Sequence, residues 1–197
     1  MPAASIDSNG RATGVASGQA TIFADYQGLR GTRLLRVLPD YQGRWRGDWR
    51  VAACAEEGDW RGICREFTNA ALFALNLGLT QARDSVTGTT DFGDELPGPV
   101  TGTIGMSGHL VVSGTYTITL EGIPIEVTVS NWQTLTTDNE RMTGRFRLGM
   151  RAAGLQGSFS TDGDLRIVTK VSATTIAATD REARGLGHSI ARIIRRP

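Results

Sequence analysis

Few residues in this chain have the types and spacing that catalysis requires. Nucleophilic catalysis needs a base beside the nucleophile, and the two histidines are His109 and His188. Ser107 and Gly108 precede His109, but they form no nucleophile-elbow pattern. His188 lies in an arginine-rich tail. We therefore interpret both histidines as structural or surface residues and not as catalytic bases.

The carboxylates of Asp91, Asp94 and Glu95 are the other candidates for chemistry. Such a group could supply the acid and base of glycoside hydrolysis or hold a calcium ion. Residues 91–99 nevertheless have the composition of a solvated loop, and they lack the ligand spacing of a recognised calcium site. Thr161–Asp164 is interpreted as a hairpin turn. With no phosphate-binding glycine motif, the sequence predicts no enzyme, no catalytic residue, no metal site and no cofactor.

Cys54 and Cys64 are the two cysteines of the chain, and they flank a polar, loop-like stretch. Two cysteines near one loop can meet and close a disulfide, worth roughly 2–3 kcal/mol in the chain-entropy model. The alternatives are two free thiols or a functional site. However, the spacing fits no zinc signature, and redox-active pairs are more often separated by two residues. We expect the disulfide, which favours an oxidising compartment.

A short pattern of an apolar residue, then Thr, Ser or Gln, then glycine recurs from residue 86 onward. Its copies are Val86–Gly88, Val100–Gly102, Val112–Gly114, Met142–Gly144 and Leu155–Gly157. Steps of about 12 to 14 residues, one of them roughly doubled, are typical of a β-meander. Counting the strands expected elsewhere, we predict an all-β fold in which about eight to ten strands close an antiparallel up-and-down barrel over residues 40–175.

The segment 43–51 alternates between apolar or small residues and charged residues, which is the period of a half-buried strand. Trp45 and Trp49 fall on the apolar face. Inward tryptophans are interpreted first as core residues, but barrels of this size can hold a small ligand. In a carrier, the predicted ligand-binding residues are Trp45, Trp49 and Trp132. The Gly43-Arg44-Trp45 triplet is similar to the motif that opens calycin barrels such as lipocalins, and the Gly/Thr-rich pattern resembles barrel domains of bacterial exported proteins.

Residues 1–39 differ in pattern from the rest of the chain. Two strands are predicted at 19–26 and 34–38, with a turn at Gln27-Gly28 after the first. Several glycines and the strand sequence Ala-Thr-Ile follow one another in an order that is characteristic of a known family of domains. These residues are Gly10, Gly14–Gly18, Ala20–Ile22, Tyr26–Gly28 and Val37. On these residues, the segment 5–38 resembles the C-terminal half of a bacterial immunoglobulin-like domain of group 2, the module of adhesin and invasin stalks. The resemblance implies a partial immunoglobulin-like sandwich.

The earlier strands of such a sandwich are absent from this sequence. Half a sandwich has unpaired edges and an uncovered apolar face, which is unfavourable in water. The segment must therefore pack on the following domain, pair with another chain, or be the remnant of a truncated gene or protein. Truncation is the favoured interpretation, and strand completion by another chain is its rival.

Residues 176–197 are predicted to form a short, basic amphipathic helix. Its apolar residues Leu186, Ile190, Ile193 and Ile194 recur at helical spacing among arginines. Such a helix can contact an anionic membrane, but docking on its own domain is favoured. The net charge of +1 argues against nucleic acid as a partner.

The first ten residues lack the basic start and apolar stretch of a signal peptide. Either the chain is cytosolic or Met1 is not the natural start. The predicted disulfide favours the second option, with an extracellular or cell-surface location and a signal upstream. We expect a non-enzymatic structural or adhesion module that binds a protein partner or self-associates through residues 5–38. The alternative is a calycin-like barrel that binds a small apolar or aromatic ligand.

Overall fold

The computed structural model describes residues 2–67, 72–93, 96–136, 138–171 and 190–191 of the 197-residue chain. Four strands come first: β1 (Ala4–Ile6), β2 (Ala12–Gly14), β3 (Gly18–Tyr26) and β4 (Leu29–Val37). Eight longer strands follow: β5 (Gly43–Glu56), β6 (Leu72–Ala82), β7 (Ser85–Phe92), β8 (Leu96–Ile104), β9 (Leu110–Leu120), β10 (Ile123–Thr136), β11 (Arg141–Ala152) and β12 (Phe159–Val171). A 3-10 turn η1 (Gly58–Trp60) and a short helix α1 (Cys64–Phe67) lie between β5 and β6.

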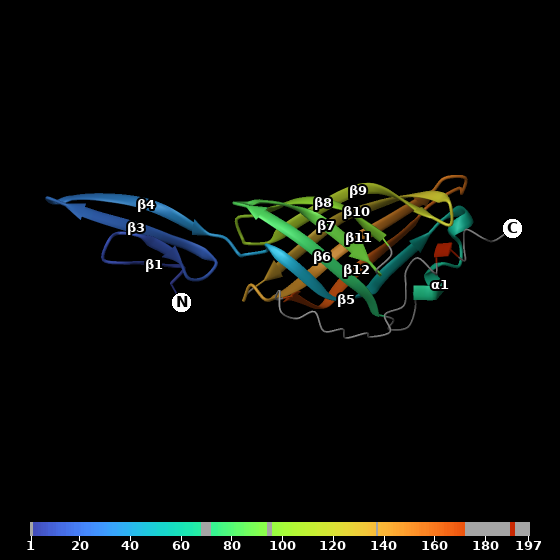
Figure 1. Ribbon diagram of the computed structural model, residues 1–197, viewed down its shortest axis with the longest axis horizontal. Coiled ribbons are helices and arrows are strands. Elements are labelled where there is room, and N and C mark those ends of the chain that lie inside the picture. The colour runs from blue at the N-terminus through green and yellow to red at the C-terminus, as the bar shows by residue number, and fades with distance from the viewer. Residues whose placement is uncertain (1, 68–71, 94–95, 137, 172–189, 192–197) are drawn as a thin grey trace.

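Strands β5 to β12 form one closed barrel in which each strand pairs antiparallel with the next (Figure 1). The last strand, β12, returns to pair with the first, β5, over a register from Phe159 opposite Glu56 to Val171 opposite Arg44. The predicted all-β fold and antiparallel up-and-down barrel are therefore confirmed, with eight strands. Closure pairs both edges of every barrel strand, so the barrel itself presents no free edge.

The alternation predicted for the segment 43–51 is present in β5. Trp45 and Trp49 are buried in the interior, while Arg44, Arg46 and Arg50 are exposed on the outer wall. The same alternation runs through β8 and β11. The interior is thus one apolar cluster built from all eight strands, and its burial is the main favourable contribution to folding.

Four of the five copies of the recurring apolar–polar–glycine pattern lie on the inward side of the barrel wall, and the fifth, Leu155–Gly157, lies in the turn between β11 and β12. The apolar residues of the four copies, Val86, Val100, Val112 and Met142, are buried, and the glycine two positions later faces the same way. A Cβ atom on Gly88, Gly102, Gly114 or Gly144 would overlap a carbonyl oxygen of the neighbouring strand. The pattern therefore puts a residue without a side chain where the curved wall brings two backbones close together.

The hairpin turn predicted at Thr161–Asp164 is wrong, because these residues lie inside β12. Gly163 faces inward, where a Cβ would meet the rings of Phe146 and Trp49. Its neighbour Asp162 faces outward and accepts two hydrogen bonds from Arg147, at 2.7 and 3.1 Å. Packing on one side and ion pairing on the other thus override a local turn signal.

The loop predicted at residues 91–99 is shorter than expected. Asp91 and Phe92 end β7, and Leu96–Pro99 already belong to β8. The Asp91 carboxylate accepts the backbone N–H of Leu96 at 3.0 Å and so bridges the turn. Asp94 and Glu95 lie outside the described residues.

Tyr41 closes the end of the barrel from which β4 arrives, called here the hairpin end. Its ring is fully buried, and its hydroxyl donates to the carbonyl of Gly108 at 2.9 Å and accepts the N–H of Thr136 at 3.3 Å. Trp45 Nε1 in turn donates to the Tyr41 carbonyl at 2.8 Å. Burial raises the pKa of the Tyr41 phenol, which therefore remains a neutral donor at ordinary pH.

The opposite end, called the helix end, is covered by a plug made of residues 57–67. Trp60, Ile63 and Phe67 of the plug are buried, and the rings of Trp60 and Phe67 stack on Phe159 of β12. Cys64 at the start of α1 forms a disulfide with Cys54 of β5, which confirms the predicted bond. The disulfide ties the plug covalently to the wall.

The first four strands form two separate two-stranded sheets, β1–β2 and β3–β4. Figure 1 shows them extending away from the hairpin end of the barrel. At the base of β4, Arg36 Nη2 donates to the carbonyls of Ile104, at 3.1 Å, and Gly105 in the β8–β9 turn. The strands predicted at 19–26 and 34–38 are present within β3 and β4. The structure shows two small antiparallel sheets in this segment. The finer prediction, an immunoglobulin-like half-sandwich, stays a prediction.

Most of the predicted C-terminal helix, residues 176–197, lies outside the described residues. Ile190 and Ala191 are described, and both are helical and buried. Ile190 belongs to the apolar cluster of the barrel. None of the described helices has the length and apolar character to cross a membrane.

The close backbone approach at Gly102 gives a direct test of the wall packing. We expect Gly102→Ala to lower the free energy of unfolding by about 1–3 kcal/mol, because the added methyl group collides with the Val111 carbonyl. Gly149→Ala in β11 is the control, since its Cβ would lie 3.9 Å from the nearest atom. Equal urea stabilities of the two variants would contradict this account of the pattern.

Candidate functional site

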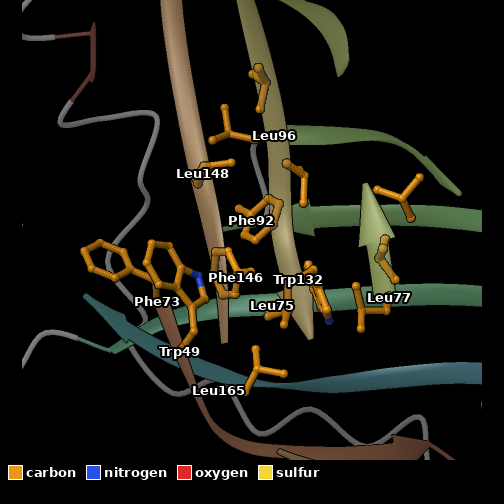
Figure 2. Close-up of a cluster of buried hydrophobic side chains, with 14 of the residues drawn as sticks. Trp49, Phe73, Leu75, Leu77, Phe92, Leu96, Trp132, Phe146, Leu148 and Leu165 are labelled. Carbon is orange, nitrogen blue, oxygen red and sulfur yellow. The ribbon is translucent and has the colours of Figure 1, made fainter. Parts of the chain in front are cut away.

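The barrel interior is the first candidate site, and a row of aromatic rings runs through it. Figure 2 shows Phe73, Trp49, Phe146 and Trp132 side by side. Trp49 lies 5.0 Å from Phe73 and 5.1 Å from Phe146 between ring centroids, and Trp132 lies 5.1 Å from Phe146. Phe92 of β7 reaches Trp132 from across the barrel at 6.1 Å. The five rings join strands β5, β6, β7, β10 and β11 into one packed unit.

Of the three predicted ligand-binding residues, two lie together and one lies apart. Trp49 and Trp132 share Phe146 as a neighbour. Trp45 lies instead toward the hairpin end, where its Nε1 bonds to Tyr41 and Lys170 Nζ lies 5.5 Å from its ring centroid. Trp45 therefore belongs to the closure of the hairpin end, and only Trp49 and Trp132 face the central interior.

Several buried polar atoms have no hydrogen-bond partner among the described residues. They are the indole nitrogens of Trp49, Trp60 and Trp132 and the hydroxyls of Thr90, Thr134 and Thr136. Trp132, Thr134 and Thr136 occupy every second position of β10 and all face inward. A buried donor or acceptor without a partner costs about 1–3 kcal/mol. Such groups are therefore either a cost of the fold or part of a binding site.

The three threonines were not identified from the sequence. Threonine is common in strands of every kind, so its type alone gives no signal. The only available signal was register: Thr134 and Thr136 follow Trp132 at period two, which places them on the same inward face.

Ser107 and His109 give the closest approach to a catalytic arrangement. The Ser107 hydroxyl and His109 Nδ1 lie 2.9 Å apart. Both side chains are exposed in the turn before β9, and no ion pair joins His109 to a carboxylate among the described residues. The third group that orients a catalytic base is not seen there. Within the same part of the chain, no three His, Cys, Asp or Glu residues are placed to hold a metal ion.

The second candidate site is the surface of the β3–β4 hairpin. Tyr26 and Leu29 oppose each other at its tip and are 73% and 76% exposed. Farther toward the barrel, Phe23 and Leu34 are also more than half exposed. β1–β2 contacts the base of the same hairpin, where Gly14 lies against Val37. The hairpin thus presents exposed apolar side chains along most of its length.

The fold and these two surfaces define the molecule as an eight-stranded antiparallel up-and-down barrel with a projecting N-terminal hairpin. Comparison with known proteins adds no relative: the chain matches no protein-family model, no curated protein and no solved structure. The functional argument therefore depends on the chain's own residues.

One carboxylate also helps to hold the plug that covers the helix end. Glu56 Oε2 accepts the backbone N–H of Cys64 at 2.8 Å. Hydrogen bonds from the backbone of Gly62 and Cys64 lower the pKa of Glu56 below its usual value. These bonds favour the ionised form.

This lowered pKa predicts a pH-dependent contribution to stability. Because the folded pKa lies below the unfolded one, the Glu56 contribution is complete above the unfolded pKa and disappears as the pH falls through the folded pKa. We expect Glu56→Gln to be less stable than the wild type at neutral pH, with the difference shrinking below about pH 4. Urea titrations across pH would measure it, with the exposed Glu126→Gln as control. A difference that stays constant with pH would contradict the assignment.

Proposed function

We propose that the protein is a non-enzymatic module for structural assembly or adhesion that self-associates through its N-terminal hairpin. The observation that carries the proposal is the exposure of Tyr26, Leu29, Phe23 and Leu34 on a two-stranded sheet. An isolated hairpin is marginal in water. In the register, Tyr26 and Leu29 lie on one face of the hairpin and Phe23 and Leu34 lie on the other. Apolar side chains are therefore exposed on both faces, and exposed apolar patches are typical of interaction surfaces.

The unpaired strand edges support the same proposal. Among the described strands, β1 to β4 each have one unpaired edge, while β5 to β12 have none. A free edge is a template for pairing with another chain. Any association that uses strand edges must therefore take place at the N-terminal sheets.

The Cys54–Cys64 disulfide supports an extracellular or cell-surface location. Disulfides persist in oxidising compartments and are rare in the cytosol. The adhesion role rests in addition on the resemblance of residues 5–38 to stalk modules of bacterial surface proteins.

Sedimentation of a hairpin variant tests this function. We expect the wild type to associate with increasing concentration, over a range up to roughly 500 µM because small interfaces bind weakly. The double variant Tyr26→Ser with Leu29→Ser should remain monomeric at every concentration, since it removes the apolar contact.

Met106→Ser is the matched control, because Met106 is equally exposed but lies in the β8–β9 turn of the barrel. It should associate like the wild type. A wild type that stays monomeric, or a hairpin variant that associates as well as the wild type, would refute the proposal.

A second candidate function is a carrier that binds a small aromatic ligand in the barrel. The specific observation in its favour is the set of unpartnered buried groups, above all Trp132 Nε1 and Thr134 Oγ1 on one strand. These groups would hydrogen-bond to polar atoms of a ligand whose body packs on the aromatic row.

Two threonine variants separate a binding role from a purely structural one. Thr134→Val removes an unpartnered hydroxyl, so we expect it to raise the free energy of unfolding by about 1 kcal/mol. It should at the same time weaken the quenching of tryptophan fluorescence by 1-naphthol. Thr161→Val is the matched control: the Thr161 hydroxyl is buried but donates to the Ala53 carbonyl at 3.0 Å, so this variant should lose about 1 kcal/mol and bind as before. Absence of any fluorescence response to 1-naphthol in the wild type would count against the carrier.

A further inference from the structure

Charged residues are distributed unevenly around the barrel wall. β8 and β9 contain no charged residue, and Asp91 is the one charged residue of β7. β11 contains four arginines and no carboxylate, and all four arginines are exposed. β5 adds three exposed arginines. Because β11, β12 and β5 are neighbours in the barrel (Figure 1), positive charge is concentrated on one side of a protein whose net charge is only +1.

One row of residues across β11, β12 and β5 has an arginine at each end and no carboxylate between them. Arg141, Thr169 and Arg46 are paired side by side in the register. Neighbouring strands are about 4.8 Å apart, so the backbones of the two arginines are about 10 Å apart. Both arginines are exposed. This row therefore presents two positive charges on either side of a neutral residue.

A second row, four residues along β11 and β5, has a carboxylate at its centre. Arg145, Asp164 and Arg50 are paired across the same three strands. Both arginines bind the one carboxylate, each at 3.3 Å. The side chain of Asp164 is only 21% exposed, whereas those of Arg145 and Arg50 are 84% and 49% exposed. The arginines therefore face solvent above a carboxylate that offsets one of their two charges.

Between the two rows, Arg166 of β12 is exposed and Asp48 of β5 is half-buried. We define the arginine patch as the five arginines of the rows and of the strip between them, Arg46, Arg50, Arg141, Arg145 and Arg166. With the two aspartates, Asp48 and Asp164, its net charge is +3. Acidic residues bound the patch at the hairpin end, where the Asp138 carboxylate accepts the backbone N–H groups of Glu140 and Arg141 at 3.0 and 2.8 Å.

The clustering of the arginines indicates a charged partner. Exposed ion pairs contribute little to stability, and two arginines that share Asp164 exceed what ion pairing within the wall needs. Charges that only keep a protein soluble could lie anywhere on its surface, yet β8 and β9 have none. A surface that carries one sign of charge attracts and holds partners of the other sign. The partner of the arginine patch is therefore an anion.

The rest of this face indicates the class of anion. Among the described side chains of β5, β11 and β12, no large apolar residue is exposed, so nothing here inserts into the apolar part of a membrane. For the same reason no aromatic ring is available for stacking on nucleic-acid bases. The planar guanidinium of arginine matches a carboxylate in geometry. A linear acidic polysaccharide carries carboxylates at regular intervals, and such polymers occur outside cells, where the disulfide places this protein in our proposal.

A recess beside the patch gives room for the sugar rings. Its volume is about 640 Å³, and it crosses β10, β11, β12 and β5. Ala52, Ala53 and Gly163 line it with little or no side chain, and Arg145 and Asp164 belong to both the recess and the patch. A polymer that lies across the strands in this recess therefore reaches the arginines directly.

We propose that the arginine patch binds a linear acidic polysaccharide through the carboxylates of the polymer. Arg46 and Arg141 are the principal contacts, since no carboxylate lies between them in their row. The inference does not depend on self-association, because the patch lies on the barrel wall and the hairpin is not part of it. In this arrangement the barrel attaches to the polymer while the hairpin joins copies of the protein.

Calorimetric titration with polygalacturonate tests the proposal. The wild type should bind at low salt, lose most of its affinity at high salt because screening weakens exposed charges, and give no signal with neutral dextran. The double variant Arg46→Gln with Arg141→Gln should bind roughly tenfold or more weakly, because it removes two charge-assisted contacts. Arg11→Gln with Arg33→Gln is the matched control: both arginines are exposed in the N-terminal segment, and the loss of net charge is the same.

A gain of affinity gives a second test that misfolding cannot imitate. Asp164→Asn removes the negative charge beneath Arg145 and Arg50, so it should bind polygalacturonate roughly threefold more tightly. The Tyr26→Ser variant with Leu29→Ser should bind like the wild type, which separates this inference from the hairpin function.

Several outcomes would overturn the assignment. A wild type that does not bind polygalacturonate, or that binds dextran as well, contradicts recognition of an acidic polymer. Unchanged binding in the Arg46/Arg141 variant, or no gain in Asp164→Asn, shows that the patch is not the site. Tighter binding at the same salt to duplex DNA or to phosphatidylglycerol vesicles than to polygalacturonate would assign the patch to that other class of partner.

Discussion

The pairing of β12 with β5 is the constraint on which the rest of the structure depends. It joins the last barrel strand to the first and so leaves no free edge in the barrel. Closure requires strands that curve strongly. This explains the register shifts in β5, β10 and β12 and the inward glycines where neighbouring backbones nearly touch. The same closure encloses the aromatic row, so Trp49, Phe146 and Trp132 pack against one another instead of facing water.

Closure also confines each candidate function to one part of the molecule. Both ends of the barrel are covered, by Tyr41 at the hairpin end and by the disulfide-tied plug at the helix end. A ligand in the interior would have to pass one of these covers, and the helix end is held by the Cys54–Cys64 bond and by Glu56. Association through the hairpin needs no such opening. The exposed surface is therefore the simpler route to a function, and it is the one we favour.

Periodicity in the sequence was enough to predict the barrel and its antiparallel order, and two cysteines beside one loop were enough to predict the disulfide. The alternation around Trp45 and Trp49 reports burial directly, and two cysteines allow a single pairing within the chain. Asp162-Gly163-Asp164 was misread because its turn composition is local, whereas its ion pairs and the ring above Gly163 come from other strands. The unpartnered threonines were missed for a related reason: their lack of a hydrogen-bond partner arises from the packing of several strands, which no single segment specifies.

A recess of about 640 Å³ on the outer wall, lined by residues of β5, β10, β11 and β12, is itself a consequence of closing the barrel. A flat wall of regular strands would present a continuous layer of outward side chains, and shifts of register interrupt that layer. Here the interruptions in neighbouring strands coincide, so Ala52, Ala53 and Gly144 line one recess. The ion pairs of Asp162 and Asp164 lie at its rim. They contribute little to stability on an exposed surface. The curvature that removes free edges from the barrel thus also creates a recess on its wall.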